Sequence, residues 1–210
     1  MDLQHAAVIV DIVGSKALDD RRHTQAAILT AFAGVDEYLG AGSPFVATVG
    51  DEFQAVYPSV GIALEATLAA RLALPEGIDC RFGIGWGEVR EVGRGVLGPV
   101  QDGSAWWRAR EAIEEAHLRE DTRTPSLRGW FVGDDASLAA VVNAYLLTRD
   151  HLVTAMSARA RRLTLGALSG RLQSELAAEE GISQGAVSQS LRRSGAVSVL
   201  TATQSLRAAL

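Results

Sequence analysis

The chain has 210 residues, of which 48% are apolar, and its formal net charge at pH 7 is −5. This length suits one domain of ordinary size with a small appendage, and the apolar content argues against a disordered chain. No apolar run reaches the roughly 20 residues of a membrane span, and the first residues lack the basic start of a secretion signal. Because Cys80 is the only cysteine, an internal disulfide is excluded, and we expect a soluble cytoplasmic protein with no membrane partner.

The charge is unevenly distributed along the chain. Residues 155–210 contain seven arginines and three glutamates, a net charge of +4, which leaves −9 for residues 1–154. A basic appendage on an acidic body is typical of a nucleic-acid-binding module, although an ordinary solvated arginine surface would give the same count.

The first three-quarters of the chain alternates between expected strands and helices. A buried strand is expected over Ala6–Val13, because a single aspartate interrupts the apolar run AAVIVDIV. The other expected elements, in order, are a helix over 20–39, a hairpin of strands 45–49 and 52–57, a helix over 61–74, a strand over 79–86, a short hairpin over 88–100, a helix over 103–119, a strand over 130–132 and a helix from Asp134 or Asp135 to Met156.

This order of elements predicts an α+β fold with a ferredoxin-like antiparallel sheet and helices on one face. In the helix over 103–119, the spacing of Arg110 and Glu114 predicts a salt bridge. Only helices are expected after residue 156. The change in charge near Ser157 predicts a boundary between an α+β domain over 1–156 and a small all-α domain over 157–210.

The strongest local signal in the helical part is the spacing of Ala177, Gly181 and Val187. In a helix-turn-helix, such an alanine lets the second helix approach closely, the glycine ends the first helix in a left-handed conformation, and the valine packs the second helix onto the first. We therefore predict helices over 173–180 and 183–193, with Ser183 as N-cap of the second.

The second of these helices would expose polar side chains suited to DNA. Glutamine and arginine can read base edges, while serine and arginine can hold phosphates. The predicted DNA-binding residues are Ser183, Gln184, Ser188, Gln189, Arg192 and Arg193. A helical unit used only for packing or dimerisation is the alternative.

Two aspartates lie in comparable places in the first domain. Asp11 interrupts the first strand, and Asp51 stands at the tip of the expected hairpin. Because the first strand of such a sheet neighbours that hairpin, both carboxylates could reach one metal ion, and the amides from Val13 to Lys16 could cradle phosphates. A hydrogen-bonded aspartate at a strand end and an ordinary hairpin aspartate would leave the same pattern.

Several segments resemble nucleotide cyclases. DIVGS at 11–15 and VGDEF at 49–53 resemble the metal-binding strand and hairpin of class III nucleotidyl cyclases, and the second also resembles the loop of GGDEF-type diguanylate cyclases. RFGIGWGEV at 81–89 and GVLGPVQDGSAWWRAR at 95–110 resemble the next cyclase strand and the stretch before the last active-site helix. Over about residues 1–200 the chain resembles the SatD family, a cyclase-like domain followed by a helix-turn-helix.

The resemblance implies Mg²⁺ at Asp11 and Asp51, a nucleotide ligand and a homodimer. The residues matched to the triphosphate loop are Ile12, Val13, Gly14 and Ser15, with Lys16 adding a positive charge.

Other positions depart from the cyclase pattern. Ala47 stands where cyclases have a base-selecting lysine. If Gly103 opens the last helix, Trp107 and Glu111 take the places of an asparagine and a transition-state arginine. An enzyme without that arginine loses a large stabilisation of the transferring phosphoryl group.

We therefore expect a transcription regulator in which a nucleotide or cyclic (di)nucleotide, bound with Mg²⁺, modulates the helix-turn-helix; a homodimer would suit two DNA half-sites. One alternative is a metal-dependent nucleotidyl cyclase or nucleotidyltransferase that uses Asp11 and Asp51 as metal ligands. Another is a ligand-free scaffold whose carboxy-terminal helices bind a protein partner.

Overall fold

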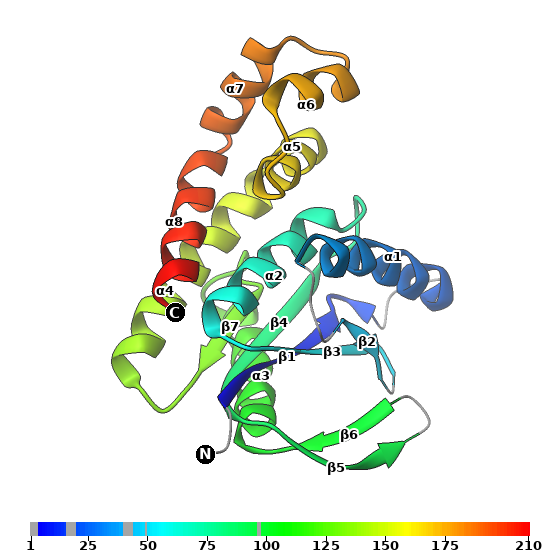
Figure 1. Ribbon diagram of the computed structural model, residues 1–210, viewed down its shortest axis with the longest axis vertical. Helices are drawn as coiled ribbons and strands as arrows, with labels where there is room; N and C mark the ends of the chain where they lie inside the picture. Colours follow the sequence, from blue (N-terminus) through cyan, green and yellow to red (C-terminus); the bar gives the residue numbers. More distant parts are fainter. Residues whose placement is uncertain (1–3, 16–19, 40–43, 49, 96–97) are drawn as a thin grey trace.

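The computed structural model of the protein describes residues 4–15, 20–39, 44–48, 50–95 and 98–210. A five-stranded sheet lies at the centre of its amino-terminal part, with the strand order β2-β3-β1-β4-β7 (Figure 1). The strands are β1 (Gln4–Ile12), β2 (Val46–Ala47), β3 (Glu52–Tyr57), β4 (Cys80–Glu88) and β7 (Gly129–Val132). The strand expected over 45–49 is shorter than predicted, and Val49 lies outside the described residues.

The sheet is mixed. β1 pairs antiparallel with β3 and β4, and the order β2-β3-β1-β4 is the predicted ferredoxin-like arrangement. β7, however, runs parallel to β4, so the expectation of a wholly antiparallel sheet is wrong. The reason is topological. Helix α3 (Ser104–Thr122), which comes between β4 and β7 in the chain, crosses the face of the sheet and brings the chain back to the end at which β4 starts, so β7 runs in the same direction as β4.

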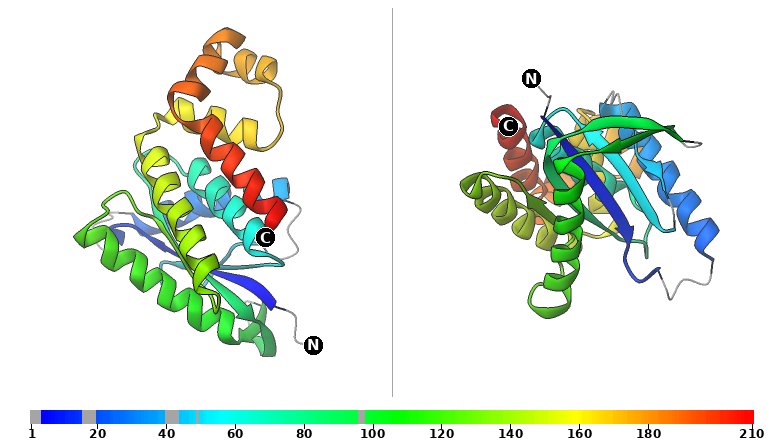
Figure 2. Two further views of the ribbon diagram at one scale, coloured as in Figure 1. Left: turned by 90° about the vertical axis from the view of Figure 1, so that its left-hand side faces the viewer. Right: turned by 90° about the horizontal axis from the view of Figure 1, so that it is seen from below.

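Helices cover both faces of the sheet, which corrects the expectation that they lie on one face. Helices α1 (Arg21–Leu39) and α2 (Val60–Ala73) share an apolar cluster with Val8 and Val10 of β1. α3 lies on the opposite face, against Ala7 and Ile9 (Figure 2). It approaches β4 closely because the strand carries glycine there: a Cβ added to Gly83 would lie 2.3 Å from the Ala109 carbonyl oxygen.

A second, two-stranded sheet projects from the main one. Strands β5 (Arg90–Gly95) and β6 (Gly98–Asp102) pair antiparallel. They form an arm that lies below β2 and β3 in the view of Figure 1. A hairpin was predicted over 88–100, and it is present with its strands displaced by about two residues.

The rest of the chain is helical, as predicted. The helices are α4 (Ala136–Ala155), α5 (Ala158–Leu168), α6 (Gln173–Glu180), α7 (Gln184–Arg193) and α8 (Ala196–Ala209). Asp135, one of two predicted caps, caps α4 by accepting hydrogen bonds from the amides of Ser137 and Leu138. None of the helices in the described part of the chain combines the length and apolar composition that crossing a bilayer requires.

Helices α6 and α7 meet in the turn that the sequence predicts. α6 ends at Gly181, whose φ of 65° is left-handed. Ser183 precedes α7 and caps it, because its side chain accepts a hydrogen bond from the amide of Ala186. Val187 and Leu191 are buried, so α7 packs through one face and presents the other to solvent.

The last helix returns to the sheet-bearing part of the chain. α8 lies on α2 at Gly61, where an added Cβ would be 2.7 Å from the Cα of Arg207. Arg207 pairs with the buried Glu65 of α2, and the hydroxyl groups of Tyr145 and Thr203 lie 2.6 Å apart between α4 and α8. One buried apolar cluster runs from β1 through α2 to α7, so the two predicted domains share a core.

Candidate functional site

Three charged side chains form a row across the sheet at the end of β1. Asp11 shares the α3-facing side of β1 with Ala7 and Ile9, because alternate residues of a strand share a face. It is opposite Glu52 on β3 and Arg81 on β4. Side chains directly opposite each other on neighbouring strands share a face, so Glu52, Asp11 and Arg81 lie side by side.

The β2–β3 turn brings Asp51 to this row. The amide of Thr48 donates to the Glu52 carbonyl oxygen at 2.9 Å, and Gly50 has a left-handed φ of 84°. Gln25 of α1 holds the turn by donating to the Gly50 carbonyl oxygen at 2.6 Å. The negative charge of Asp51 contributes to raising the pKa of Asp11. The two predicted metal-binding aspartates therefore lie close enough to interact.

Asp11 is in a poor environment for an isolated carboxylate. Burial raises its pKa; Arg81 opposes this effect, and the charges of Asp51 and Glu52 add to it. Its Oδ1 atom is buried, makes no hydrogen bond, and lies 3.5 Å from Arg81 Nη1. A buried carboxylate oxygen without a hydrogen-bond partner, within electrostatic range of a second aspartate, suits a divalent cation.

The protein does not by itself supply a complete metal cage. Within the described residues there is no group of three or more histidine, cysteine, aspartate or glutamate side chains arranged to hold a metal ion. Mg²⁺ commonly binds through one or two carboxylates and completes its shell with water and phosphate oxygens. Asp11 and Asp51 would therefore suit an ion that completes its shell with water or with the phosphate oxygens of a ligand.

The loop after β1 contains the predicted phosphate-binding residues. Ile12 is buried in the core, so only its backbone faces the loop, and the Val13 amide already donates to the Asp79 carbonyl oxygen at 3.0 Å. Gly14 is exposed with φ 67°, and a Cβ added there would meet nothing within 4 Å. Gly14 and the half-buried Ser15 are thus the accessible positions of this loop. Lys16 lies outside the described residues.

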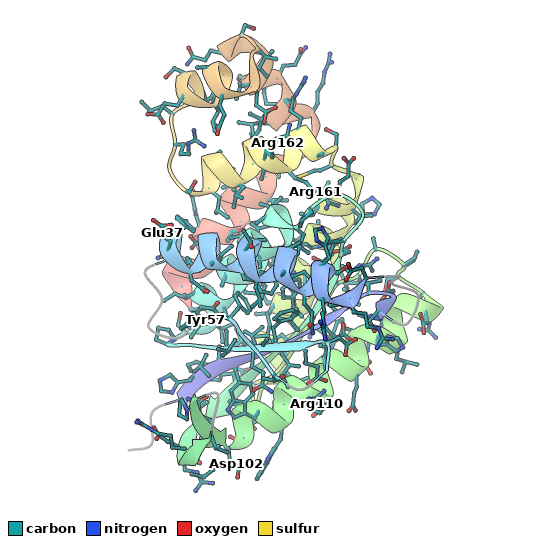
Figure 3. The ribbon with its side chains drawn as sticks, turned by 90° about the vertical axis from the view of Figure 1, so that its right-hand side faces the viewer. Glu37, Tyr57, Asp102, Arg110, Arg161 and Arg162 are labelled. Atoms are coloured by element: carbon teal, nitrogen blue, oxygen red, sulfur yellow. The ribbon has the colours of Figure 1, made fainter. Side chains whose placement is uncertain are left out.

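Arg110 of α3 adds a positive charge to the site. Figure 3 labels its side chain, which extends from α3. Arg110 donates two hydrogen bonds to Glu52, at 2.6 and 2.8 Å, and its side chain is 44% exposed. The close ion pair of Arg110 is thus with Glu52 and not with the predicted Glu114, although the charge of Glu114 also contributes to raising the pKa of Arg110. Arg108 instead donates to the Trp86 carbonyl oxygen and to Asp134.

The predicted DNA-binding residues lie on or beside α7. Gln184, Gln189, Arg192 and Arg193 are exposed, Ser188 is half-buried, and Ser183 is exposed with its hydroxyl group capping the helix.

The two arginines of α7 differ electrostatically from Arg159 and Arg162 on α5 and from Arg171 before α6; Arg161 of α5 also lacks an ion pair within the described residues, but it is half-buried. Arg159 and Arg162 pair with Glu180, and Arg171 pairs with Glu179. Arg192 and Arg193 form no ion pair with any residue that the structure describes. The exposed, unpaired positive charge of this region is therefore concentrated at the end of α7.

A family model described as the SatD family matches residues 5–208. The chain belongs to the SatD family. A comparison with curated proteins gave no match.

This SatD-family chain is similar in structure to several nucleotide cyclases. It matches the catalytic core of a rhodopsin-guanylyl cyclase with 18% identity and a TM-score of 0.41, over 52% of this chain and 71% of that one. A bacterial light-regulated adenylyl cyclase matches with 14% identity and a TM-score of 0.48, and the chain spans 43% of that protein while 62% of its own length is covered. The adenylyl cyclase CyaB from P. aeruginosa matches with 15% identity and a TM-score of 0.40, over 57% of this chain and 81% of that one.

Sequence reasoning missed three residues at the site of this SatD-family protein. Arg81, Glu120 and Glu52 contact or neighbour the predicted ligands, but they lie on different elements. The register in which β1 pairs with β3 and β4 decides which charged side chains lie opposite each other. The only local signal is that Glu52 directly follows Asp51.

Proposed function

We propose that this SatD-family protein is a DNA-binding regulator. In this proposal α6 and α7 form a helix-turn-helix, and a nucleotide or cyclic (di)nucleotide bound with Mg²⁺ at Asp11 and Asp51 modulates it. The observation that carries the proposal is the concentration of unpaired positive charge at Arg192 and Arg193, on the exposed face of a helix whose other face is buried.

The geometry of the helix pair supports the DNA-binding part. Gly181 turns the chain in a left-handed conformation, and Val187 fixes α7 against its neighbours. Ser183, Gln184, Ser188 and Gln189 then stand at and after the amino end of α7, the end that enters the major groove in a helix-turn-helix.

The nucleotide-binding part rests on the row at the end of β1. Asp11 and Asp51 would hold Mg²⁺, and the loop that follows Ile12 and Val13 would contact phosphates through Gly14 and Ser15, with Lys16 as an added charge. The ion would supply positive charge that screens the phosphates from these carboxylates.

A DNA-binding assay with matched arginine variants tests the regulator. Fluorescence anisotropy of labelled genomic fragments at low salt should show binding by the wild-type chain, with an affinity that changes when nucleotide and Mg²⁺ are added. The double variant Arg192→Ala/Arg193→Ala should lose about tenfold or more in affinity, because phosphate contacts dominate DNA binding. Arg159→Ala/Arg162→Ala removes the same charge from residues paired with Glu180 and should change affinity far less.

A homodimer would place two copies of α7 on two DNA half-sites. A groove of about 600 Å³ lies between β2–β3 and the β5–β6 arm, and the exposed Val46 and Val100 line it. Exposed apolar surface of this kind marks protein interfaces. Val100→Asp should convert a dimer to a monomer in sedimentation, and a wild-type monomer at every concentration would exclude this arrangement.

Arg110 favours an enzyme as a second candidate. Its guanidinium group binds Glu52, the neighbour of Asp51 in the chain, and would supply the positive charge that a transferring phosphoryl group needs, although Trp107 and Glu111 stand exposed at the positions aligned with the cyclase pair. Incubation with nucleoside triphosphates and Mg²⁺ or Mn²⁺, followed by product analysis, tests this. Cyclic or oligonucleotide products that disappear in Asp51→Ala and Arg110→Ala would establish the enzyme; no product would exclude it.

A further inference from the structure

Arg81 stands between two carboxylates that belong to different parts of the fold. Its Nη1 atom lies 3.5 Å from Asp11 Oδ1, and its Nε atom lies 3.2 Å from Glu120 Oε2 on α3. The Arg81 side chain is only 7% exposed, so these two carboxylates supply most of its charge compensation.

Both contacts are ion pairs without hydrogen bonds. Ten buried side-chain nitrogen or oxygen atoms of the described residues lack a hydrogen-bond partner, and four of them belong to this triad: Asp11 Oδ1, Arg81 Nε, Arg81 Nη1 and Glu120 Oε2. A buried charge is well accommodated only when it is both paired and hydrogen-bonded. Arg81 is thus weakly held by two partners.

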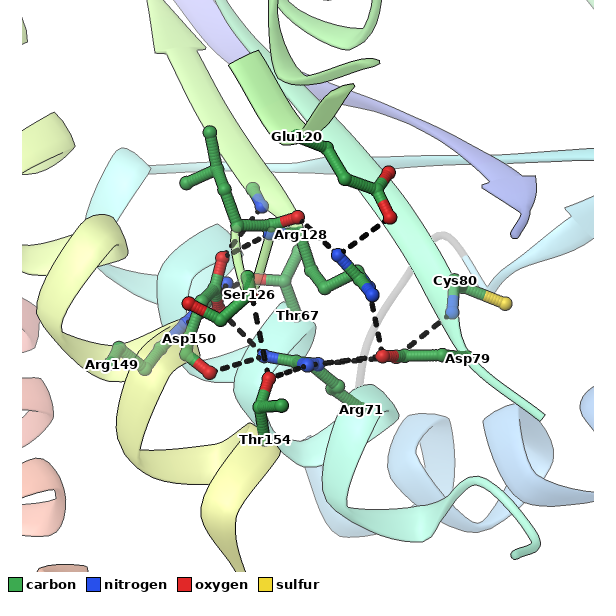
Figure 4. Close-up of polar contacts among 12 residues, drawn as sticks. Thr67, Arg71, Asp79, Cys80, Glu120, Ser126, Arg128, Arg149, Asp150 and Thr154 are labelled. Atoms are coloured by element: carbon green, nitrogen blue, oxygen red, sulfur yellow. Dashed lines mark hydrogen bonds and ion pairs between the residues drawn. The ribbon is translucent and has the colours of Figure 1, made fainter. Parts of the chain in front are cut away.

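The other side of Glu120 is firmly bonded. Its Oε1 atom lies 2.9 Å from Arg128 Nη1, and Arg128 Nε donates to Asp79 at 2.8 Å. Arg71 of α2 also binds Asp79 and reaches Asp150 of α4, both of which appear in Figure 4.

Asp150 fixes the start of β7. Its Oδ2 atom accepts hydrogen bonds from the amides of Arg128 and Gly129, each at 2.7 Å. A continuous series of charged contacts therefore joins Asp11 to α4, the helix that precedes α5, α6 and α7 in the chain.

We infer that Arg81 is a displaceable counterion for Asp11, and that a divalent cation at Asp11 moves it onto Glu120. This inference rests on the proposed cation site. The cation replaces the charge that Arg81 supplies, and the freed guanidinium group binds Glu120 fully. Glu120 then holds Arg128 less tightly, which loosens the start of β7 against α4. Occupancy of the site is thereby transmitted toward the helices that carry α7.

Calorimetric titration of the full chain with Mn²⁺ alone tests the displacement, because the inference predicts whether each variant binds Mn²⁺ more or less tightly than the wild type. Arg81→Gln removes the competing charge and should bind Mn²⁺ about tenfold more tightly than wild type. Glu120→Gln removes the alternative partner, holds Arg81 on Asp11 and should weaken binding several-fold. Arg108→Gln, which removes an equal charge from an arginine bonded to Trp86 and Asp134, should leave the affinity unchanged.

The double variant Arg81→Gln/Glu120→Gln covers the case in which Arg81→Gln fails to fold, because it removes the carboxylate oxygen of Glu120 that would lose Arg81 as its partner. It should also bind Mn²⁺ more tightly than wild type. Wild-type binding with unchanged or weaker binding in both Arg81 variants overturns the inference alone. No binding in the wild type or any variant overturns the proposed cation site together with it.

Hydrogen exchange tests the transmission. Mn²⁺ should speed exchange of the Arg128 and Gly129 amides in the wild type and leave it unchanged in Glu120→Gln at saturating Mn²⁺. Equal effects in both proteins would show that the contact through Glu120 does not transmit cation binding to the start of β7.

Discussion

Asp11 is a residue whose place in the fold costs stability. Its carboxylate is largely buried, one oxygen has no hydrogen-bond partner, and its pKa is raised by burial even though Arg81 is near. An ionised group with a raised pKa disfavours the folded state above that pKa, so at neutral pH Asp11 works against folding. Such sites are common where a residue serves binding rather than stability.

Asp11→Asn should therefore stabilise the chain while removing its response to cations. The amide has the same shape without the charge, and Arg81 keeps Glu120 as a partner. We expect a rise in Tm of about 2–4 °C, the shift that about 1 kcal/mol produces in a protein of this size. Thermal unfolding with and without Mg²⁺ and nucleotide should show a ligand-induced shift only in the wild type. A lower Tm for Asp11→Asn would mean that the pair with Arg81 outweighs burial.

Asp79 has the opposite electrostatic balance. Burial alone would raise its pKa, but Arg71 and Arg128 outweigh burial and hold the pKa below the ordinary value of 3.8. A lowered folded pKa gives stability that is fully present above the unfolded pKa and is lost as the pH falls through the folded pKa.

Asp79→Asn should consequently cost about 3 kcal/mol at pH 7, because it leaves two arginines short of a buried partner. Urea unfolding at pH 7, 5 and 3 should show the difference from wild type shrinking at the lowest pH, because that pH lies below the ordinary pKa of an unfolded aspartate and nearer to the lowered pKa of the folded one. A difference that stays constant across this range would contradict the role assigned to Asp79.

Single residues at the site were only partly predictable from the sequence. Asp11 and Asp51 stand out because an aspartate in an apolar strand and one in a glycine turn are local signals. Arg81 and Glu120 give no such signal. Their meeting depends on the pairing of β1 with β4 and on where α3 crosses, which are properties of tertiary structure.

Among the elements, the contact of α8 with α2 depends on one glycine. A Cβ at Gly61 would lie 2.7 Å from Arg207 Cα and 3.0 Å from the Leu206 carbonyl oxygen, both of them backbone atoms that cannot rotate away. Gly34 of α1 provides a matched contrast, because a Cβ there would meet nothing within 4 Å.

Gly61→Ala and Gly34→Ala should therefore change stability in opposite directions. Alanine in a helix is favoured over glycine by about 0.5–1 kcal/mol, and Gly34→Ala should gain roughly that amount. Gly61→Ala should lose about 1–3 kcal/mol through overpacking against α8. Urea unfolding measures both. Equal stabilisation by the two substitutions would show that α8 does not lie on α2 in solution.

The elements themselves were largely predictable, and the sheet was less so. Capping and turn residues placed α6 and α7 to within a residue, because Gly181 and Ser183 act locally. The direction of β7 and the face covered by α3 were missed. Both follow from α3 crossing the sheet, which the close approach at Gly83 and Gly85 permits and which no periodicity reveals.

At the scale of the whole molecule, charge pairing decides how much of the basic region is available to DNA. Residues 155–210 carry a net charge of +4, but Glu179 and Glu180 occupy three of their arginines, and Arg207 pairs with Glu65. Arg192 and Arg193 are the exposed arginines of α7. The proposed regulator should therefore make fewer phosphate contacts than the seven arginines of this region would allow.

The salt dependence of DNA binding measures that number. If each copy of a homodimer sets Arg192 and Arg193 on phosphates, about four phosphates are neutralised, and log K should fall against log salt with a slope of about −3.6. Replacing both arginines with alanine should bring the slope close to zero, whereas Arg159→Ala/Arg162→Ala should leave it near the wild-type value. A wild-type slope steeper than about −6 would mean that the paired arginines leave their glutamates when DNA binds. The positive charge of the whole region, rather than the end of α7, would then be the DNA-binding surface.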